Sequence, residues 1–316
     1  MKILIAESES YTDDTIRVYE KLGNVVYGNS NWNIIRKSIK NCDVLVTKLK
    51  FVYSEEILKQ CPKLKYIVTS TTGENHIKVP LNRDIGIISL KGEKDFLKKI
   101  TPTAELTWGL LLSLSRMIPE AIKSVKDKSW NREPFISNEL AGKNIGIIGF
   151  GRLGKIVTKY ALAFNMNVYF YDNNPDEITD LDNNIKQTSL ENLLEVSDFI
   201  SIHIPYEKEN INFIDKKALI KVKKTAYIIN TSRGEVLDED FLLQMIEEGK
   251  IAGAALDVLS KEFSGKADWI LNSKILESKE LGKKILITPH IGGATRESIN
   301  KTDTFVAKKF ANHIKC

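Results

Sequence analysis

The chain has 316 residues, of which 42% are hydrophobic and 28% are charged, and both values are ordinary for a globular protein. This composition excludes collagen-like, low-complexity and largely disordered proteins, and the length predicts two domains. The 46 basic and 41 acidic side chains leave a net charge of +5. Because this small excess is balanced by many acids, we expect a solvated surface and no nucleic-acid binding.

The three cysteines, Cys42, Cys61 and Cys316, are far apart in the sequence, and none lies in a CxxC motif. Their spacing and odd number argue against a disulfide framework, so we expect a reducing, cytoplasmic compartment. The apolar run near the start is too short for a signal peptide. The longest apolar stretch, between Pro102 and Pro119, is shorter than a bilayer span, so no membrane segment is expected.

The first hundred residues alternate between short apolar runs and helix-like patterns. The apolar runs predict strands at 2–6, 25–28, 42–47, 65–71 and 85–90. Helices are expected at 11–22, 32–40 and 54–61. Strands that alternate with helices in this way predict a parallel sheet with helical crossovers, and this first series ends near residue 100.

Thr101 and Pro102 predict the start of a long helix that stops before Pro119. A polar stretch then leads into a second strand–helix series. Its strands are expected at 144–150, 167–172, 199–204, 226–230, 251–258 and 284–289. The two series together predict an α/β protein.

A glycine-rich loop follows the first strand of the second series. Gly149, Gly151 and Gly154 form G-x-G-x-x-G between an apolar strand and a helical pattern, and the next strand ends in Asp172. This is the arrangement of a dinucleotide-binding fold. The glycines allow a tight turn, close approach of a pyrophosphate and close helix packing. Because the Asp172 carboxylate would accept bonds from ribose hydroxyls and repel a 2′-phosphate, the pattern favours NAD over NADP.

Three polar segments follow later strands of the same series, where ligands collect in a parallel sheet. They contain Arg233, Glu262 and His290. A 2-oxo acid needs a bidentate cation for its carboxylate, which Arg provides better than Lys. Its carbonyl oxygen must gain a proton as a hydride reaches the carbon. A histidine can supply this proton, and a neighbouring carboxylate would orient the imidazole ring. No cluster has metal-ligand spacing, so no metal is expected.

These segments, in this order, resemble the D-isomer-specific 2-hydroxyacid dehydrogenase family. The matching stretches are GFGRLG at 149–154, IHIP at 202–205, INTSRGEVLDEDFLLQMIEEGKIAGAALDV at 229–258 and TPHIGGAT at 288–295. The resemblance covers nearly the whole chain. It implies NAD-dependent interconversion of a D-2-hydroxy acid and a 2-oxo acid, with Arg233 on the carboxylate, His290 as acid/base and Glu262 paired with His290.

The resemblance also assigns residues to the cofactor and to the substrate. The expected cofactor-binding residues are Gly149, Gly151, Arg152, Leu153, Gly154, Asp172, Thr231, Ser232, Asp257, Gly292, Gly293 and Thr103. For the substrate, TSTTGENHIKV at 69–79 implies that Thr72 and Gly73 offer backbone amides. Lys48 is either a contact for a second anionic group, as a phosphoglycerate dehydrogenase-like enzyme needs, or a solvated lysine. His76 is expected at the surface.

In fold, the resemblance implies two doubly wound parallel-sheet domains, with a Rossmann NAD domain at 101–289 inserted into a flavodoxin-like substrate domain. The substrate domain comprises 1–100 and 290–316, and the active site is expected in the cleft between the two domains. Relatives in this family pair through the helix after Pro102 and the arm that follows, so a homodimer is expected.

Two features depart from the common family pattern. Phe263 replaces a frequent proline, and the segment between Glu262 and His290 is long, which predicts a surface loop or an extra helix. Two alternatives to the leading function remain. One is an NAD-sensing corepressor-like binding protein with the same fold, and the other is a related enzyme such as a formate or phosphite dehydrogenase.

Overall fold

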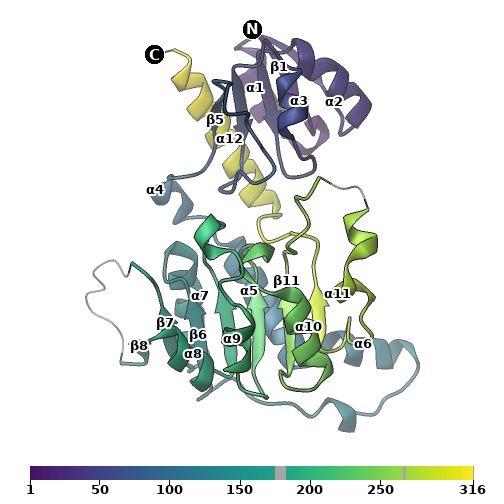
Figure 1. The fold of residues 1–316 in the computed structure, drawn as a ribbon, viewed down its shortest axis with the longest axis vertical. Helices are drawn as coiled ribbons and strands as arrows, with labels where there is room; N and C mark the ends of the chain where they lie inside the picture. Colours follow the sequence, from purple (N-terminus) through teal and green to yellow (C-terminus); the bar gives the residue numbers. More distant parts are fainter. Residues whose placement is uncertain (175–182, 266–267, 316) are drawn as a thin grey trace. The chain divides into compact units, whose positions relative to one another are not determined.

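A computed structural model describes residues 1–174, 183–265 and 268–315 (Figure 1). Contacts between Cα atoms divide the chain into two compact units. The first unit contains Met1–Ile100, Phe263–Lys266 and Ala294–Cys316, and the second contains Thr101–Glu262 and Ala267–Gly293. Each unit is built around one parallel sheet.

The sheet of the first unit has the strand order β2-β1-β3-β4-β5, with every neighbouring pair parallel. Its strands are β1 (Lys2–Ile5), β2 (Asn24–Tyr27), β3 (Val44–Thr47), β4 (Tyr66–Thr69) and β5 (Gly86–Ile88). This is the flavodoxin-like order. Its helices are α1 (Asp13–Glu20), α2 (Trp32–Ser38), α3 (Glu55–Lys59), α4 (Lys94–Leu97) and α12 (Arg296–His313).

Apolar side chains of the strands are buried on both faces of this sheet. Ile3 and Ile5 pack in a cluster with Phe310 of α12, whereas Leu4 packs with Ile35 of α2 and Leu58 of α3. Successive strand residues point to opposite faces, so a continuous apolar run is what a doubly covered parallel strand requires.

The sheet of the second unit has the order β12-β11-β10-β9-β6-β7-β8 and is also entirely parallel. Its strands are β6 (Asn144–Ile148), β7 (Asn167–Tyr171), β8 (Ile185–Gln187), β9 (Phe199–Ile202), β10 (Tyr227–Asn230), β11 (Gly253–Leu256) and β12 (Ile285–Ile287). Six of these strands follow the 3-2-1-4-5-6 Rossmann order, and β12 extends the sheet beside β11. The two sheets confirm the predicted fold class.

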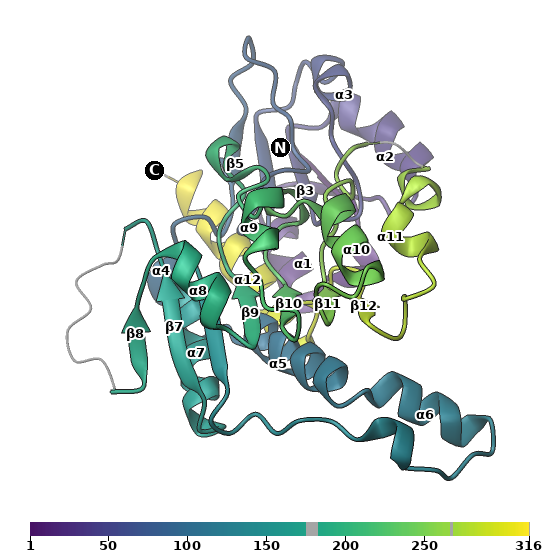
Figure 2. The ribbon, with the colours of Figure 1, turned by 60° about the horizontal axis from the view of Figure 1, so that its bottom comes forward.

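The second unit also contains helices before and between its strands. They are α5 (Pro102–Ser115), α6 (Ile118–Lys126), α7 (Arg152–Ala163), α8 (Leu190–Val196), α9 (Lys216–Ile220), α10 (Glu239–Glu247) and α11 (Lys274–Glu277). The predicted helix between Pro102 and Pro119 is interrupted, because Met117 has a left-handed φ of 50° and separates α5 from α6. Pro119 lies in the first turn of α6 instead of ending the preceding helix, since a proline is tolerated in the first turn of a helix. Figure 2 shows α6 projecting beyond the sheet from the end of α5.

One strand was not predicted from the sequence. β8 has three residues, Ile185–Gln187, and lies at the edge of the sheet beside β7. It carries no apolar run, because two of its residues are exposed polar side chains. Such an edge strand leaves no hydrophobic pattern in the sequence.

Two further expectations concern cysteines and membranes. Cys42 and Cys61 are free and buried, and Cys316 lies outside the described residues. In the parts of the chain that the structure describes, no helix combines the length and apolar character needed to cross a bilayer.

Candidate active site

The glycine loop joins β6 to α7 in the second unit. Gly149 has a φ of 92°, which favours glycine, and a Cβ at Gly154 would lie 2.2 Å from the Gly149 carbonyl oxygen. By contrast, a Cβ at Gly151 would meet no atom within 4 Å. Gly151 is the N-cap of α7, and Arg152 and Leu153 are its first residues. The loop therefore leaves open space at a helix N-terminus, which suits the pyrophosphate of NAD.

Asp172 directly follows β7 and is held against this loop. Its Oδ2 accepts a hydrogen bond from the Phe150 backbone N–H at 2.6 Å, and its Oδ1 accepts one from the Asn174 N–H at 2.9 Å. The carboxylate is thus fixed beside the glycine loop and stays partly exposed. This placement suits the predicted contact with ribose hydroxyls, which remains a prediction. Pro175, which follows Asn174 in the sequence, lies outside the described residues.

The open space at Gly151 predicts that a larger residue at this position weakens cofactor binding. Gly151→Ala should leave the fold intact, because its backbone is extended and the new Cβ meets no atom. The same methyl group would occupy space that the pyrophosphate needs, so the Kd for NADH should rise at least about tenfold, or about 1.4 kcal/mol. Titration calorimetry measures this effect. Gly109→Ala, at another open glycine in α5, is the matched control, and equal NADH affinity in both variants would contradict the assignment.

The three predicted catalytic residues all lie in the second unit. Arg233 follows β10, Glu262 comes after β11, and His290 follows β12. These strands are consecutive neighbours in the sheet, so their carboxyl ends meet at one edge. The structure thereby brings together segments that are far apart in the sequence.

His290 and Glu262 form a direct pair. The His290 Nδ1 lies 2.8 Å from the Glu262 Oε2, and the two side chains are 21% and 12% exposed. Since a carboxylate only accepts, this distance assigns the Nδ1 proton to the imidazole as donor. His290 has a left-handed φ of 53°, and its backbone N–H donates to the Asp257 carbonyl oxygen at 2.9 Å. The imidazole is therefore oriented both by its backbone and by Glu262.

Asp257 holds the loop that carries His290. Its Oδ1 accepts hydrogen bonds from the Thr288 hydroxyl at 2.6 Å and the Ile291 N–H at 2.8 Å, and its Oδ2 accepts one from the Gly292 N–H at 2.7 Å. The side chain is buried. Asp257 was predicted as a cofactor contact, which remains a prediction. The structure shows a supporting role that sequence reasoning did not identify.

The backbone around Arg233 is organised by Asn230, the last residue of β10. The Asn230 Nδ2 donates to the Arg233 carbonyl oxygen at 2.8 Å, and its Oδ1 accepts from the Ser232 N–H at 3.0 Å and the Ser232 hydroxyl at 2.8 Å. Sequence reasoning missed Asn230, although a polar residue at the end of an apolar strand was a usable signal. The Arg233 Nη1 donates to the Ser232 carbonyl oxygen at 2.6 Å.

Charges surround the Arg233 guanidinium. Burial lowers the pKa of Arg233, and the negative charges of Glu262 and Glu235 raise it. Burial also raises the pKa of Glu235, a nearby acid that sequence reasoning did not single out. A guanidinium stays protonated in proteins, so Arg233 remains a cation at neutral pH. The Arg233 cation and the His290–Glu262 pair thus lie after the carboxyl ends of neighbouring strands.

Several predicted cofactor residues also meet in this unit. The Thr231 hydroxyl lies 2.8 Å from the hydroxyl of Thr107 in α5, a buried residue that was not predicted. A Cβ at Gly292 would lie 3.1 Å from the Thr103 Cγ2, so these two candidates are neighbours. Gly293 has open space around it. The long segment before His290 contains α11 and a 3₁₀ turn at Trp269–Asn272, as the extra-helix prediction expected.

The predicted substrate residues lie in the first unit. Thr72 and Gly73 follow β4, in a loop where the Thr71 hydroxyl donates to the Gly73 carbonyl oxygen at 2.7 Å. Lys48 follows β3, and its ammonium lies 2.8 Å from the Asp303 Oδ2, so it is a partly exposed cation with a charged partner. The expectation that His76 lies at the surface was wrong. Its ring is buried, with its centroid 6.1 Å from that of Phe263, which belongs to the same unit.

Several known proteins are similar to this chain. The sequence model described as "D-isomer specific 2-hydroxyacid dehydrogenase, NAD binding domain" matches residues 108–292. A glyoxylate reductase from Thermofilum pendens is 34% identical, over 90% of this chain and 83% of its own length. A D-3-phosphoglycerate dehydrogenase from Methanocaldococcus jannaschii is 32% identical over 98% of this chain, but the match spans only 56% of that protein.

Among solved structures, a D-lactate dehydrogenase from Aquifex aeolicus, complexed with NAD and lactic acid, is similar over 100% of this chain and 96% of its own. The TM-score is 0.80 and the identity is 27%. These relatives are named as enzymes, which does not favour the corepressor-like alternative.

Proposed function

Since this chain belongs to the D-isomer-specific 2-hydroxyacid dehydrogenase family and is an NAD-dependent enzyme of that kind, we propose that it interconverts a small 2-oxo acid and the D-2-hydroxy acid, with Arg233, Glu262 and His290 as the catalytic set. The observation that supports this set most strongly is the 2.8 Å pair between the His290 Nδ1 and the Glu262 Oε2, beside the strand end that carries Arg233.

In the reducing direction, the bound cofactor supplies the hydride that reaches C2 of the substrate. Arg233 binds the substrate carboxylate through two parallel hydrogen bonds, which fixes C2 and polarises its carbonyl. Because Nδ1 is committed to Glu262, the Nε2 of His290 delivers the proton to the carbonyl oxygen. The ketone thus gains one hydride and one proton and becomes an alcohol. Glu262 stabilises the imidazolium that carries this proton before transfer.

The remaining predicted residues complete this proposal. The backbone amides of Thr72 and Gly73 would bind the substrate carboxylate. On the cofactor side, Gly149, Gly151, Gly154, Asp172, Thr231, Ser232, Gly292 and Gly293 would line the NAD site together with Arg152, Leu153, Thr103 and Asp257. We place the enzyme in the cytoplasm, which the two free, buried cysteines support.

The proposed reaction is tested by following NADH oxidation with a panel of 2-oxo acids. The panel contains glyoxylate, hydroxypyruvate, pyruvate, 2-oxoglutarate and 3-phosphohydroxypyruvate. We expect turnover with at least one of them. Tight NADH binding without turnover of any panel member would contradict the proposed function.

We also propose a homodimer that forms through the arm after α5. None of the α6 residues is buried, and Ile122 and Val125 are 52% and 53% exposed. Trp130 and Ile136, farther along the arm, are 93% and 74% exposed. Apolar side chains gathered on one projecting segment are typical of an interface.

If the dimer forms through this arm, negative charges introduced on α6 should prevent dimer formation. The unmodified chain should sediment at the mass of two chains, and the double variant Ile122→Glu, Val125→Glu should sediment at the mass of one, because buried carboxylates oppose association. Ile220→Glu, at a 64% exposed apolar position on α9, should remain dimeric. A monomeric unmodified chain would rule out the arm as an interface.

A further inference from the structure

The first unit has a cluster of charged residues where its sheet is expected to meet a ligand. In the order β2-β1-β3-β4-β5, the direction of the connections reverses between β1 and β3. Ligands of open parallel sheets bind outside the carboxyl ends of the strands at such a point. Glu7 comes shortly after β1 and Lys48 directly after β3, while the loop of Thr72 and Gly73 follows the neighbouring β4.

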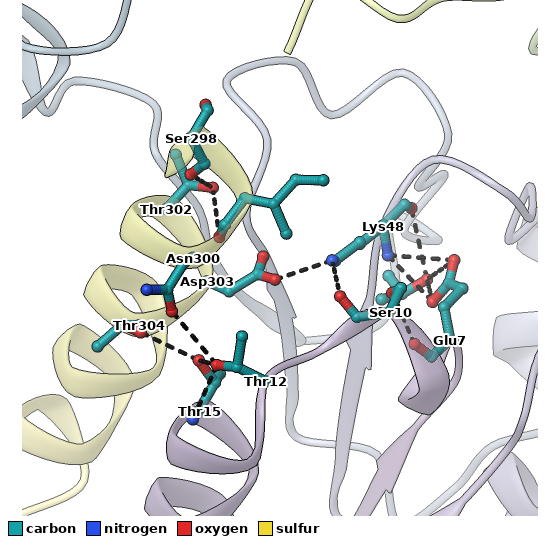
Figure 3. Close-up of polar contacts among 12 residues, drawn as sticks. Glu7, Ser10, Thr12, Thr15, Lys48, Ser298, Asn300, Thr302, Asp303 and Thr304 are labelled. Carbon is teal, nitrogen blue, oxygen red and sulfur yellow. Dashed lines mark hydrogen bonds and ion pairs between the residues drawn. The ribbon is translucent and has the colours of Figure 1, made fainter. Parts of the chain in front are cut away.

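Lys48 is committed to partners inside this unit. Its Nζ lies 2.8 Å from the Oδ2 of Asp303 in α12 and donates to the Ser10 carbonyl oxygen at 2.9 Å. It also lies 4.2 Å from the centroid of the Tyr11 ring. The Lys48 side chain is 19% exposed and that of Asp303 is 1% exposed. Figure 3 shows the ammonium group between Asp303 and Ser10.

A second carboxylate lies on the other side of Lys48. The Glu7 oxygens accept hydrogen bonds from the Lys48 backbone N–H, at 3.2 and 3.1 Å, and from the Thr47 hydroxyl. Burial raises the pKa of Glu7 to about 7, and it also raises the pKa of Asp303, against the effect of Lys48. The ion pair with Asp303 already balances the charge of Lys48, and ionisation of Glu7 makes the cluster negative. Such a cluster does not attract a phosphate dianion.

We propose that Asp303 determines the substrate class, because it withholds Lys48 from the substrate and thereby favours 2-oxo acids whose only anionic group is the carboxylate next to the carbonyl. This inference rests on the proposed function. The relatives named glyoxylate reductase and D-3-phosphoglycerate dehydrogenase have nearly the same sequence identity to this chain. Sequence identity alone therefore does not distinguish the two substrate classes. We infer the substrate class from the Lys48–Asp303 ion pair instead.

Hydroxypyruvate and 3-phosphohydroxypyruvate form a matched pair of substrates, because they differ only by the phosphate. For the unmodified enzyme we expect kcat/KM to favour hydroxypyruvate at least about tenfold. In Asp303→Asn, the ammonium loses its charged partner and can approach the phosphate, so this preference should fall at least about fivefold. The change should appear mainly as a lower KM for the phosphorylated substrate, since the phosphate is remote from the reacting carbon.

Asp43→Asn is the control, because it removes a carboxylate at the opposite end of β3, where Asp43 accepts a bond from the Lys2 N–H. The ratio of kcat/KM values for the two substrates should not change in this variant. Lys50, the exposed lysine two positions after Lys48, is present in every variant, so a change in the ratio reports on Asp303.

Two results would overturn the inference while the proposed function stands. One is a preference of the unmodified enzyme for 3-phosphohydroxypyruvate, and the other is a folded Asp303→Asn enzyme with an unchanged ratio. If Asp303→Asn does not fold, the ratio of kcat/KM values for the two substrates of the unmodified enzyme alone tests the inference. If no 2-oxo acid of the panel is turned over, the proposed function is overturned, and this inference with it.

Discussion

Replacing His290 with asparagine should lower kcat about a thousandfold and leave NADH binding unchanged. Proton transfer by a positioned histidine contributes about 10²–10⁴-fold to a rate, and the amide of asparagine cannot deliver a proton. Asparagine is the informative replacement because His290 has a φ of 53°. Asparagine adopts this conformation more readily than alanine does, so the backbone of the loop should be preserved.

Stopped-flow and steady-state kinetics with the best panel substrate measure this effect. His313→Asn, at an exposed histidine near the end of α12, is the matched control and should retain full activity. A His290→Asn enzyme that keeps more than about a tenth of kcat would show that another group supplies the proton.

Replacing Arg233 with lysine should lower kcat/KM by on the order of a hundredfold, although the positive charge is kept. A guanidinium can form two parallel bonds to a carboxylate, whereas an ammonium acts as a single point charge. Loss of one charge-assisted hydrogen bond costs about 1.5–3 kcal/mol. Lysine also cannot reproduce the bond of the Arg233 Nη1 to the Ser232 carbonyl oxygen without giving up its approach to the substrate.

The effect should appear in both KM and kcat, because Arg233 is proposed to bind the carboxylate and to polarise the carbonyl. Arg132→Lys, at a 94% exposed arginine in the arm, controls for the substitution itself. Unchanged kcat/KM in Arg233→Lys would place the substrate carboxylate elsewhere.

Much of the fold follows from local patterns in the sequence. The apolar runs that predict strands correspond to β1 through β5 and to six strands of the second sheet, because buried parallel strands carry continuous apolar segments. The glycine spacing marks the turn between β6 and α7 for a steric reason, since Gly154 has no room for a side chain. These features depend on neighbouring residues, so one sequence suffices to predict them.

Other features depend on contacts between distant parts of the chain. The Lys48–Asp303 ion pair joins residues from opposite ends of the sequence, and neither residue alone indicates its partner. The three hydrogen bonds that Asp257 accepts likewise depend on how the 288–292 loop folds back. The break between α5 and α6 arises at Met117, a residue type that does not favour a left-handed φ.

Arg233, Glu262 and His290 are proposed to catalyse hydride transfer between NAD and a small D-2-hydroxy acid. The most direct test is the reduction of NAD with the D and L enantiomers of lactate or glycerate, whichever corresponds to the better substrate of pyruvate and hydroxypyruvate, measured with the unmodified enzyme and with His290→Asn. We expect turnover of the D enantiomer alone and its loss in His290→Asn. Equal turnover of both enantiomers, or turnover that does not depend on His290, would contradict this proposal.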